Sequence, residues 1–375
     1  MIYLDYQATT PLAPEARAAM LPWLDGADGS GFGNPHSPHR VGRTATAAVE
    51  LARDQVASPF GSGGRLFFTS GATEAVNWAM KGVLTEAPAG RRKIVTIGTE
   101  HACVLDTAAW LAGRGAELVV LPVDANGLVD LAAAAAAIDD GTAIVAAMLV
   151  NNEIGVIQPI EALATLARDA GALMLCDMVQ GYGRVTLASG TCDLVAISAH
   201  KVHGPKGIGA LWVRDGVRLA PLLHGGGQEG GLRSGTLSPA LCAGFGAAAA
   251  LAADRAARDQ AHAARLFDRL RAALGEQWQL NGALDPRYRG SLNVRHAGID
   301  AGRLISELRQ VAFSAGSACA SGSGRPSHVL RAIGLTEANA RSSIRLGFGR
   351  YTTEAEIDDA ATMINAAAER QMEWA

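Results

Sequence analysis

Seven short apolar runs recur between residues 65 and 213, and segments of helical length separate most of them. The runs are nearly continuous in apolar character, which is typical of strands that are buried on both faces. This alternation predicts an α/β fold with a mainly parallel sheet and helices on both of its faces. The predicted strands are residues 66–69, 94–97, 118–121, 143–150, 173–176, 194–197 and 208–213, and the predicted helices between them are residues 73–84, 104–114, 128–138 and 160–170.

The pattern changes after about residue 237, where an Ala-rich segment over 239–274 predicts one long helix. Shorter units follow it. We predict strands over 291–294 and 343–348, and helices over 302–308, 326–333 and 353–368. These units indicate a second, smaller α+β domain.

Composition excludes several classes of protein. The 375 residues are 49% hydrophobic and 18% charged, with a net charge of −3, so charge gives no case for a nucleic-acid or membrane-surface partner. We see no uninterrupted apolar run of the roughly 18–20 residues that a membrane span needs, and no secretory signal at the N-terminus. The five cysteines form no C-x-x-C pair, which argues against a zinc site and a disulfide framework. We therefore expect no metal, a reducing cytoplasm, and ordinary packing roles for the cysteines other than Cys319.

The segment 198–207, SAHKVHGPKG, lies between two predicted strands and contains Lys201. A lysine at the end of a buried strand can lose its proton by desolvation and become a nucleophilic amine. Such an amine can form a Schiff base with a cofactor aldehyde. A solvated loop lysine is the alternative interpretation.

Two other features favour a cofactor site. Asp177 comes directly after an apolar strand, where open α/β sheets bind ligands, and its carboxylate could hold a pyridinium nitrogen protonated. The turn 69–74, TSGATE, joins a predicted strand to a predicted helix, and the N–H groups at such a helix start can bind phosphate. Together with Lys201, these features indicate a cofactor site on one sheet.

The motifs around these residues resemble those of a known family. They include YLDYQATTP, GNPHSPHRVGR, TSGATEAVNWAMKG, NNEIGVIQP, DMVQ, SAHKVHGPKGIGAL, HGGGQEGGLRSGT and SAGSACASGSGRPSHVLRAIG. The chain is similar to the cysteine desulfurases of the NifS/IscS type, within the class V aminotransferases of fold type I. The resemblance covers residues 3–357. It implies a pyridoxal 5'-phosphate enzyme with a large domain over 15–245, built on a seven-stranded sheet. Residues 1–14 and 246–375 would form the small domain.

The resemblance also implies roles for individual residues. Lys201 would form the Schiff base, Asp177 would pair with the pyridine nitrogen, and Gln180 would bond the ring hydroxyl. His101 would lie over the ring as an acid or base. The phosphate ligands would be Ala72, Thr73, Ser198, His200 and, from the partner of a homodimer, Thr236; the ligands of the substrate carboxylate would be Asn152 and Arg345.

Cys319 lies in a stretch of small residues, 314–324, where no apolar pattern would bury it. A thiolate in such a loop can attack sulfur and pass a persulfide to an acceptor. The resemblance therefore implies that L-cysteine is converted to alanine while Cys319 carries the sulfur to an unidentified acceptor. Selenocysteine lyase, another class V activity and a non-catalytic partner of a desulfurase are the alternatives. Tyr6 departs from the small residue that is common in the family, so we expect a different substrate entrance.

Overall fold

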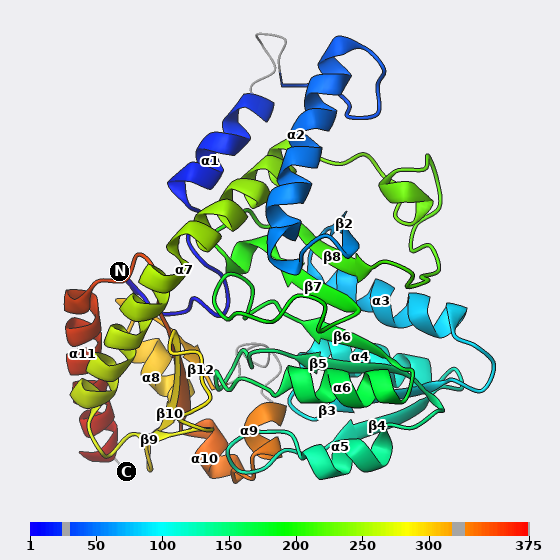
Figure 1. Ribbon diagram of the computed structural model, residues 1–375. Helices are drawn as coiled ribbons and strands as arrows, with labels where there is room; N and C mark the ends of the chain where they lie inside the picture. Colours follow the sequence, from blue (N-terminus) through cyan, green and yellow to red (C-terminus); the bar gives the residue numbers. More distant parts are fainter. Residues whose placement is uncertain (25–30, 317–326, 374–375) are drawn as a thin grey trace.

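The computed structural model describes residues 1–24, 31–316 and 327–373. A seven-stranded sheet forms the centre of the larger part of the molecule (Figure 1). Its strand order is β2-β8-β7-β6-β5-β3-β4, where β8 is antiparallel to both neighbours and the other pairs are parallel. The strands are β2 (Gly64–Thr69), β3 (Lys93–Ile97), β4 (Glu117–Leu121), β5 (Thr142–Met148), β6 (Leu173–Asp177), β7 (Leu194–Ser198) and β8 (Gly209–Arg214). All seven predicted strands are confirmed; continuous apolar runs are typical of strands covered on both faces, although the edge strand β4 is partly exposed.

Helices cover both faces of this sheet. One face packs against α3 (Ala72–Glu86) and α4 (Ala102–Ala112). The other face packs against α2 (Arg40–Ala57), α5 (Leu131–Ala137) and α6 (Ile160–Asp169). The short helices of this part are α1 (Pro14–Met20), η1 (Leu21–Trp23), η2 (Ser58–Phe60), η3 (Ala199–Lys201) and η4 (Glu229–Gly231).

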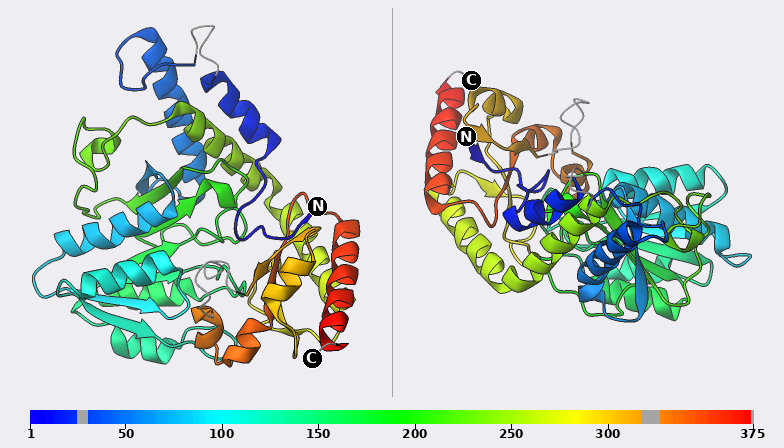
Figure 2. Two further views of the ribbon diagram at one scale, coloured as in Figure 1. Left: turned by 180° about the vertical axis from the view of Figure 1, so that it is seen from behind. Right: turned by 90° about the horizontal axis from the view of Figure 1, so that it is seen from above.

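The long predicted helix is confirmed as α7 (Pro239–Leu274), which begins at the capping side chain of Ser238. Its first half packs against α1 and α2, and its second half runs beside α11 (Glu354–Glu373) in the smaller part (Figures 1 and 2). By length and composition, α7 could cross a membrane, although it contains no uninterrupted apolar run of that length. Its buried residues include Phe245 and Phe267, which belong to two different cores, so α7 is a packed helix of the fold.

The smaller part contains an antiparallel sheet of order β12-β13-β10-β9 and a parallel pair β1-β11. Its strands are β1 (Ile2–Tyr3), β9 (Gln279–Leu280), β10 (Ser291–Arg295), β11 (Val311–Ala312), β12 (Ser314–Ala315) and β13 (Ser343–Gly347). Its helices besides α11 are α8 (Ala301–Glu307), α9 (His328–Ala332) and α10 (Glu337–Arg341). The predicted helices and strands of this part are present, and α11 extends beyond the predicted end at residue 368.

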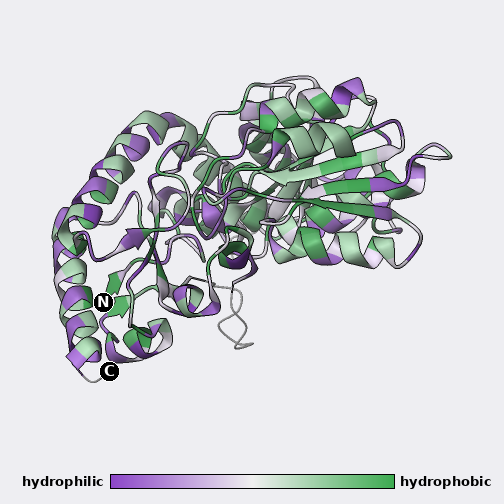
Figure 3. Ribbon diagram, turned by 90° about the horizontal axis from the view of Figure 1, so that it is seen from below, coloured by the Kyte–Doolittle hydropathy of each residue, from purple (hydrophilic) through white to green (hydrophobic). Residues whose placement is uncertain are grey.

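A separate apolar core holds this smaller part together. It joins Leu4 at the N-terminus to Leu266 of α7, Leu346 of β13 and Ile364 of α11. The first residues of the chain thus pack with the last ones. In Figure 3, the strands of the large sheet are mostly hydrophobic, whereas the long helices alternate between hydrophobic and hydrophilic residues. The domain division into 15–245 and 1–14 with 246–375 stays a prediction.

Candidate active site

A cavity of about 690 Å³ lies at the carboxyl ends of the central strands, and the N-terminal segment and β13 complete its wall. Parallel strands direct their carboxyl ends to the same edge, which is where α/β sheets bind ligands. The structure brings ten of the twelve predicted site residues to this cavity: Ala72, Thr73, His101, Asn152, Asp177, Gln180, Ser198, His200, Lys201 and Arg345.

Lys201 ends the short helix η3, which follows β7. Its Nζ donates to the backbone carbonyls of Gln7, at 2.5 Å, and of Ala8, at 2.8 Å. Gln7 and Ala8 were not among the predicted site residues, although they lie in the YLDYQATTP motif. The N-terminal segment therefore positions the amine that the sequence singled out.

Asp177 is the last residue of β6 and is buried beside the cavity. Its Oδ1 accepts a hydrogen bond from the backbone N–H of Val179 at 2.9 Å. Burial raises the pKa of Asp177, and the nearby His101 and Lys201 partly oppose that shift. A cation placed against this carboxylate would be stabilised, and a protonated pyridine ring nitrogen is such a cation.

His101 caps the start of α4, and its Nδ1 accepts from the backbone N–H of Cys103 at 3.1 Å. Burial lowers the pKa of His101, Asp177 raises it, and Lys201 lowers it further. The ring is therefore neutral near pH 7, and the contact with Cys103 assigns the ring proton to Nε2. The cap and the acid/base role are compatible, because they use different nitrogens.

The start of α3 provides donors for an anion. Gly71 precedes the helix, and no side chain of the described residues caps the N–H groups of Ala72 and Thr73. Glu74 instead accepts from the backbone of Ser70 at 2.9 Å. A Cβ built on Gly71 would lie 4.0 Å from Ser198 Oγ, its nearest described neighbour, so the space above the turn is open. Uncapped N–H groups, the helix dipole and this space fit the phosphate of pyridoxal phosphate.

Two further predicted residues are held by contacts across the cavity. The Nδ1 atom of His200 lies 3.2 Å from the Oγ1 atom of Thr9. Burial, followed by the charge of Lys201, lowers the pKa of His200 to about 4. Gln180 is buried, and its Nε2 donates to the carbonyl of Gln7 at 2.9 Å.

Arg345 of β13 reaches the cavity from the smaller part of the molecule. Its Nη1 donates to the carbonyl of Asn152 at 3.0 Å, and its Nη2 pairs with Asp5 Oδ1 at 2.8 Å. The side chain is 1% exposed, and its Nε has no hydrogen-bond partner among the described residues. Asp5 was not a predicted site residue. A buried guanidinium with an unused donor is suited to binding a carboxylate.

Two predicted site residues are not in the described cavity. Thr236 is exposed, on the segment between η4 and α7, and Cys319 lies outside the described residues.

The other four cysteines differ in their burial and in their distance from the cavity. Cys103 is half-buried: it packs against the core beneath α3 and α4, as expected, but it also lines the cavity, whereas Cys176, Cys192 and Cys242 are buried. Tyr6 is buried and stacks edge-on with His203, away from the lining of this cavity. No cluster of three potential metal ligands occurs in the described ranges.

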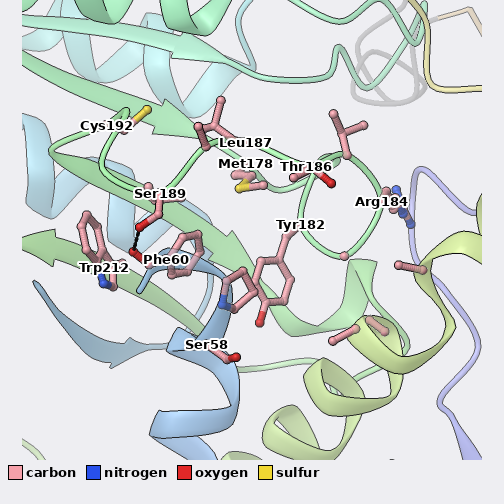
Figure 4. A pocket seen from close by; sticks show the side chains of 18 of the residues that line it. Ser58, Phe60, Met178, Tyr182, Arg184, Thr186, Leu187, Ser189, Cys192 and Trp212 are labelled. Atoms are coloured by element: carbon pink, nitrogen blue, oxygen red, sulfur yellow. Dashed lines mark hydrogen bonds between the residues drawn. The ribbon is translucent and has the colours of Figure 1, made fainter. Parts of the chain in front are cut away.

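A second cavity of about 300 Å³ lies behind the loop that follows β6 (Figure 4). Phe60, Tyr182 and Trp212 form an aromatic wall, with the ring centroids of Phe60 lying 5.9 Å from Tyr182 and 5.7 Å from Trp212. Its described lining contains none of the predicted site residues. The larger, polar cavity is therefore the candidate active site, since ten of the predicted site residues line it.

Comparison with known proteins agrees with this arrangement. Residues 2–359 match the family described as aminotransferase class V, so the chain belongs to that family. It is 45% identical over 372 residues to "Cysteine desulfurase IscS" of Rickettsia bellii (strain OSU 85-389), covering 97% of this chain and 90% of the relative. It is likewise 45% identical over 373 residues to the IscS of Rickettsia akari (strain Hartford), with the same coverage.

Solved structures give the same result for the fold. A "NifS-like protein" superimposes with a TM-score of 0.90 at 32% identity, covering 98% of this chain and 99% of the other. DndA from Streptomyces lividans superimposes with a TM-score of 0.78 at 36% identity, covering 92% and 98%. These matches confirm the predicted fold type and the predicted family. As a class V enzyme of this kind, the protein uses pyridoxal phosphate.

Proposed function

We propose that the protein is a cysteine desulfurase that takes sulfur from L-cysteine, carries it on Cys319 and releases alanine. The observation that carries this proposal is the polar cavity, where Lys201, Asp177 and the uncapped start of α3 face one space. The sequence relatives supply the reaction, since they are named cysteine desulfurases.

The cofactor site follows from these positions. The N–H groups of Ala72 and Thr73, with the side chains of Ser198 and His200, hold the phosphate, and Asp177 pairs with the ring nitrogen. Pyridoxal phosphate, when bound, withdraws electrons from the substrate carbon and so eases proton loss and cleavage of the bond to sulfur. Lys201 supplies the amine that binds the cofactor aldehyde.

The substrate carboxylate binds Arg345 and Asn152. The guanidinium already contacts the carbonyl of Asn152 and the carboxylate of Asp5, and these contacts fix its plane. Because its Nε is buried without a described partner, a bound carboxylate oxygen would satisfy this donor. Substrate orientation thus depends on a residue from each part of the molecule.

Proton transfer falls to His101 and Lys201. A neutral imidazole near pH 7 can accept or give a proton, and burial keeps His101 in that form. The amine of Lys201 is held by two carbonyl acceptors and can move away from them when a substrate amine replaces it. These residues are the two acid/base groups of the site.

The described residues that flank the segment 317–326 support the assignment of Cys319. On one side, Ser314 Oγ donates to Asp5, the partner of Arg345, at 2.9 Å. On the other side, His328 Nε2 contacts the carbonyl of Glu100, the neighbour of His101, at 2.8 Å. Both flanks therefore lie beside residues of the cavity wall.

We also propose that the enzyme is a cytoplasmic homodimer in which Thr236 reaches the phosphate site of the partner. Its exposure in the single chain supports this assignment. A sulfur acceptor completes the cycle, because a persulfide gives up its outer sulfur to another thiol. Delivery to iron–sulfur cluster assembly or to tRNA thiolation would suit such a donor.

The test is to add L-cysteine and a reductant to the purified holoenzyme and to measure sulfide and alanine. Equal amounts of both products are expected, and Cys319→Ala should abolish sulfide release. Cys103→Ala is the matched control, because Cys103 lines the cavity and is the only cysteine among the described residues that does so; this variant should remain active. Loss of sulfide release in Cys103→Ala but not in Cys319→Ala would show that our proposal assigns the sulfur to the wrong thiol.

A further inference from the structure

Arg184 does not line the polar cavity, yet it contacts two residues that do. Its Nη1 donates to Gln180 Oε1 at 2.6 Å, and its Nη2 donates to the backbone carbonyl of Lys201. In Figure 4, the Arg184 side chain points away from the aromatic wall of the apolar cavity and toward the N-terminal segment. Arg184 thus lies behind the cofactor site, in contact with its back wall.

The position of Arg184 is itself fixed from two directions. Its backbone carbonyl accepts from Gln260 Nε2 of α7 at 2.6 Å. Its guanidinium carbon lies 5.2 Å from the ring centroid of Tyr288, which precedes β10. A cation over an aromatic face is attracted to it, so Tyr288 holds the guanidinium while Gln260 holds the main chain.

These contacts decide which way the Gln180 amide faces. A guanidinium only donates hydrogen bonds, so the group that faces Arg184 must be the amide oxygen. A backbone carbonyl only accepts them, so the group that faces Gln7 must be the amide nitrogen. Both neighbours require the same orientation. Gln180 therefore presents its amide nitrogen toward the cavity. The contact with Gln7 uses one of the two amide hydrogens, and the other can donate to a ligand in the cavity.

We propose that Arg184 is a positioning residue that keeps Gln180 a hydrogen-bond donor to the ring oxygen of the cofactor. This inference rests on the proposed function and on the contact with the ring hydroxyl that the family resemblance implies for Gln180. A donor stabilises the ionised form of the ring oxygen, whereas a rotated amide would offer a carbonyl and favour the protonated form. Through the carbonyl of Lys201, the same guanidinium also holds the turn that bears the reactive amine.

The experiment compares two ligands on the apoenzyme: pyridoxal phosphate and its 3-deoxy analogue, which lacks the ring hydroxyl. Arg184→Met keeps the length of the side chain but removes the donors. It should weaken binding of pyridoxal phosphate about three- to tenfold and change binding of the analogue by less than about twofold. Arg184→Lys, which retains a donor, should recover most of the affinity for pyridoxal phosphate.

A spectroscopic measurement accompanies the binding data. In Arg184→Met, the visible band of the bound cofactor should titrate at a higher pH than in wild type, because the ionised ring oxygen loses its donor. Arg289→Met is the matched control, since this arginine adjoins Tyr288 but pairs with the exposed Asp268. It should leave both the affinity and the titration unchanged. Thermal melting of each apoprotein reports whether the variants are folded.

The outcomes separate this inference from the proposed function. If wild type binds pyridoxal phosphate but Arg184→Met loses the same affinity for both ligands, Arg184 supports only the fold and the inference is overturned. An unshifted titration in Arg184→Met would overturn it as well. If the wild-type apoprotein binds neither ligand, the proposed function fails together with the inference.

Discussion

The two cavities beside the loop after β6 are lined by neighbouring residues but differ in chemistry. Asp177 and Gln180 face the polar cavity, whereas Met178 and Tyr182 face the apolar one. Of these residues, only Asp177 belongs to β6, and the turn that follows it runs between the two spaces, so adjacent positions in the sequence serve separate cavities. The comparison shows that single residues, and not whole segments of the chain, determine whether each cavity is polar or apolar.

The titratable groups beside the two cavities differ in the same way. The pKa of Asp177 is raised and the pKa of His200 is lowered, each mainly by burial next to the polar cavity. On the apolar side, the Tyr182 hydroxyl donates to the carbonyl of Val56 at 2.8 Å, and burial raises its pKa. Shifted groups that face an open space are candidates for catalysis, whereas a bonded tyrosine in a packed wall is structural.

The largest expected effect is on kcat, and it tests whether the adjacent residues Asp177 and Met178 serve different cavities. Asp177→Asn should lower kcat on the order of 10²- to 10³-fold, because it removes the charge that the proposed function places against the ring nitrogen. Its free energy of unfolding at pH 7 should not fall, since burial already opposes the charged form of Asp177. Met178→Leu, the neighbouring control, should retain activity and cost less than about 1.5 kcal/mol. Kinetics and urea unfolding check both variants; similar losses of activity would remove the distinction between the cavities.

A second variant tests the apolar side. Phe60→Ala removes a buried ring from the aromatic wall and should lower the free energy of unfolding by about 3–5 kcal/mol. The kcat of the folded fraction should stay near that of wild type, because Phe60 lies outside the polar cavity. Phe60→Leu should cost less, since it fills more of the space. A large loss of kcat in folded Phe60→Leu would show that the apolar cavity takes part in catalysis.

The smallest expected effect is on the free energy of unfolding at acidic pH. Burial, followed by the charge of Arg350, lowers the pKa of His203 to about 4. Because the folded pKa lies below the ordinary value of about 6.5, this group contributes stability above pH 6.5 that is lost as the pH falls toward 4. The loss should reach roughly 1–2 kcal/mol by pH 5.

His203→Asn tests this effect, since His203 has a φ of 66° and asparagine tolerates that left-handed conformation. The variant should show a smaller drop in unfolding free energy between pH 7 and pH 5 than wild type. His224→Asn is the control, because His224 is exposed. An unchanged drop in His203→Asn would mean that other groups cause the acid sensitivity.

Much of the fold could be predicted because the large sheet is buried on both faces. Continuous apolar runs marked all of its strands, and the helices between them were found with shifted ends. Among the described residues, three α-helices escaped prediction: α1, α2 and α10. The two-residue strands β1, β9, β11 and β12 escaped as well, because two residues carry no period and form strands only where a distant partner pairs with them.

The amino-acid sequence by itself determined the residue types and their positions at strand ends, which is why Lys201, Asp177 and the turn before α3 could be singled out as candidates. Tertiary structure decided what surrounds them. The contact of Gln7 with Lys201 and the pairing of Asp5 with Arg345 join residues far apart in the chain. No local pattern encodes such contacts, because they form only when the N-terminal segment packs with β11 and β13 and so crosses the cavity.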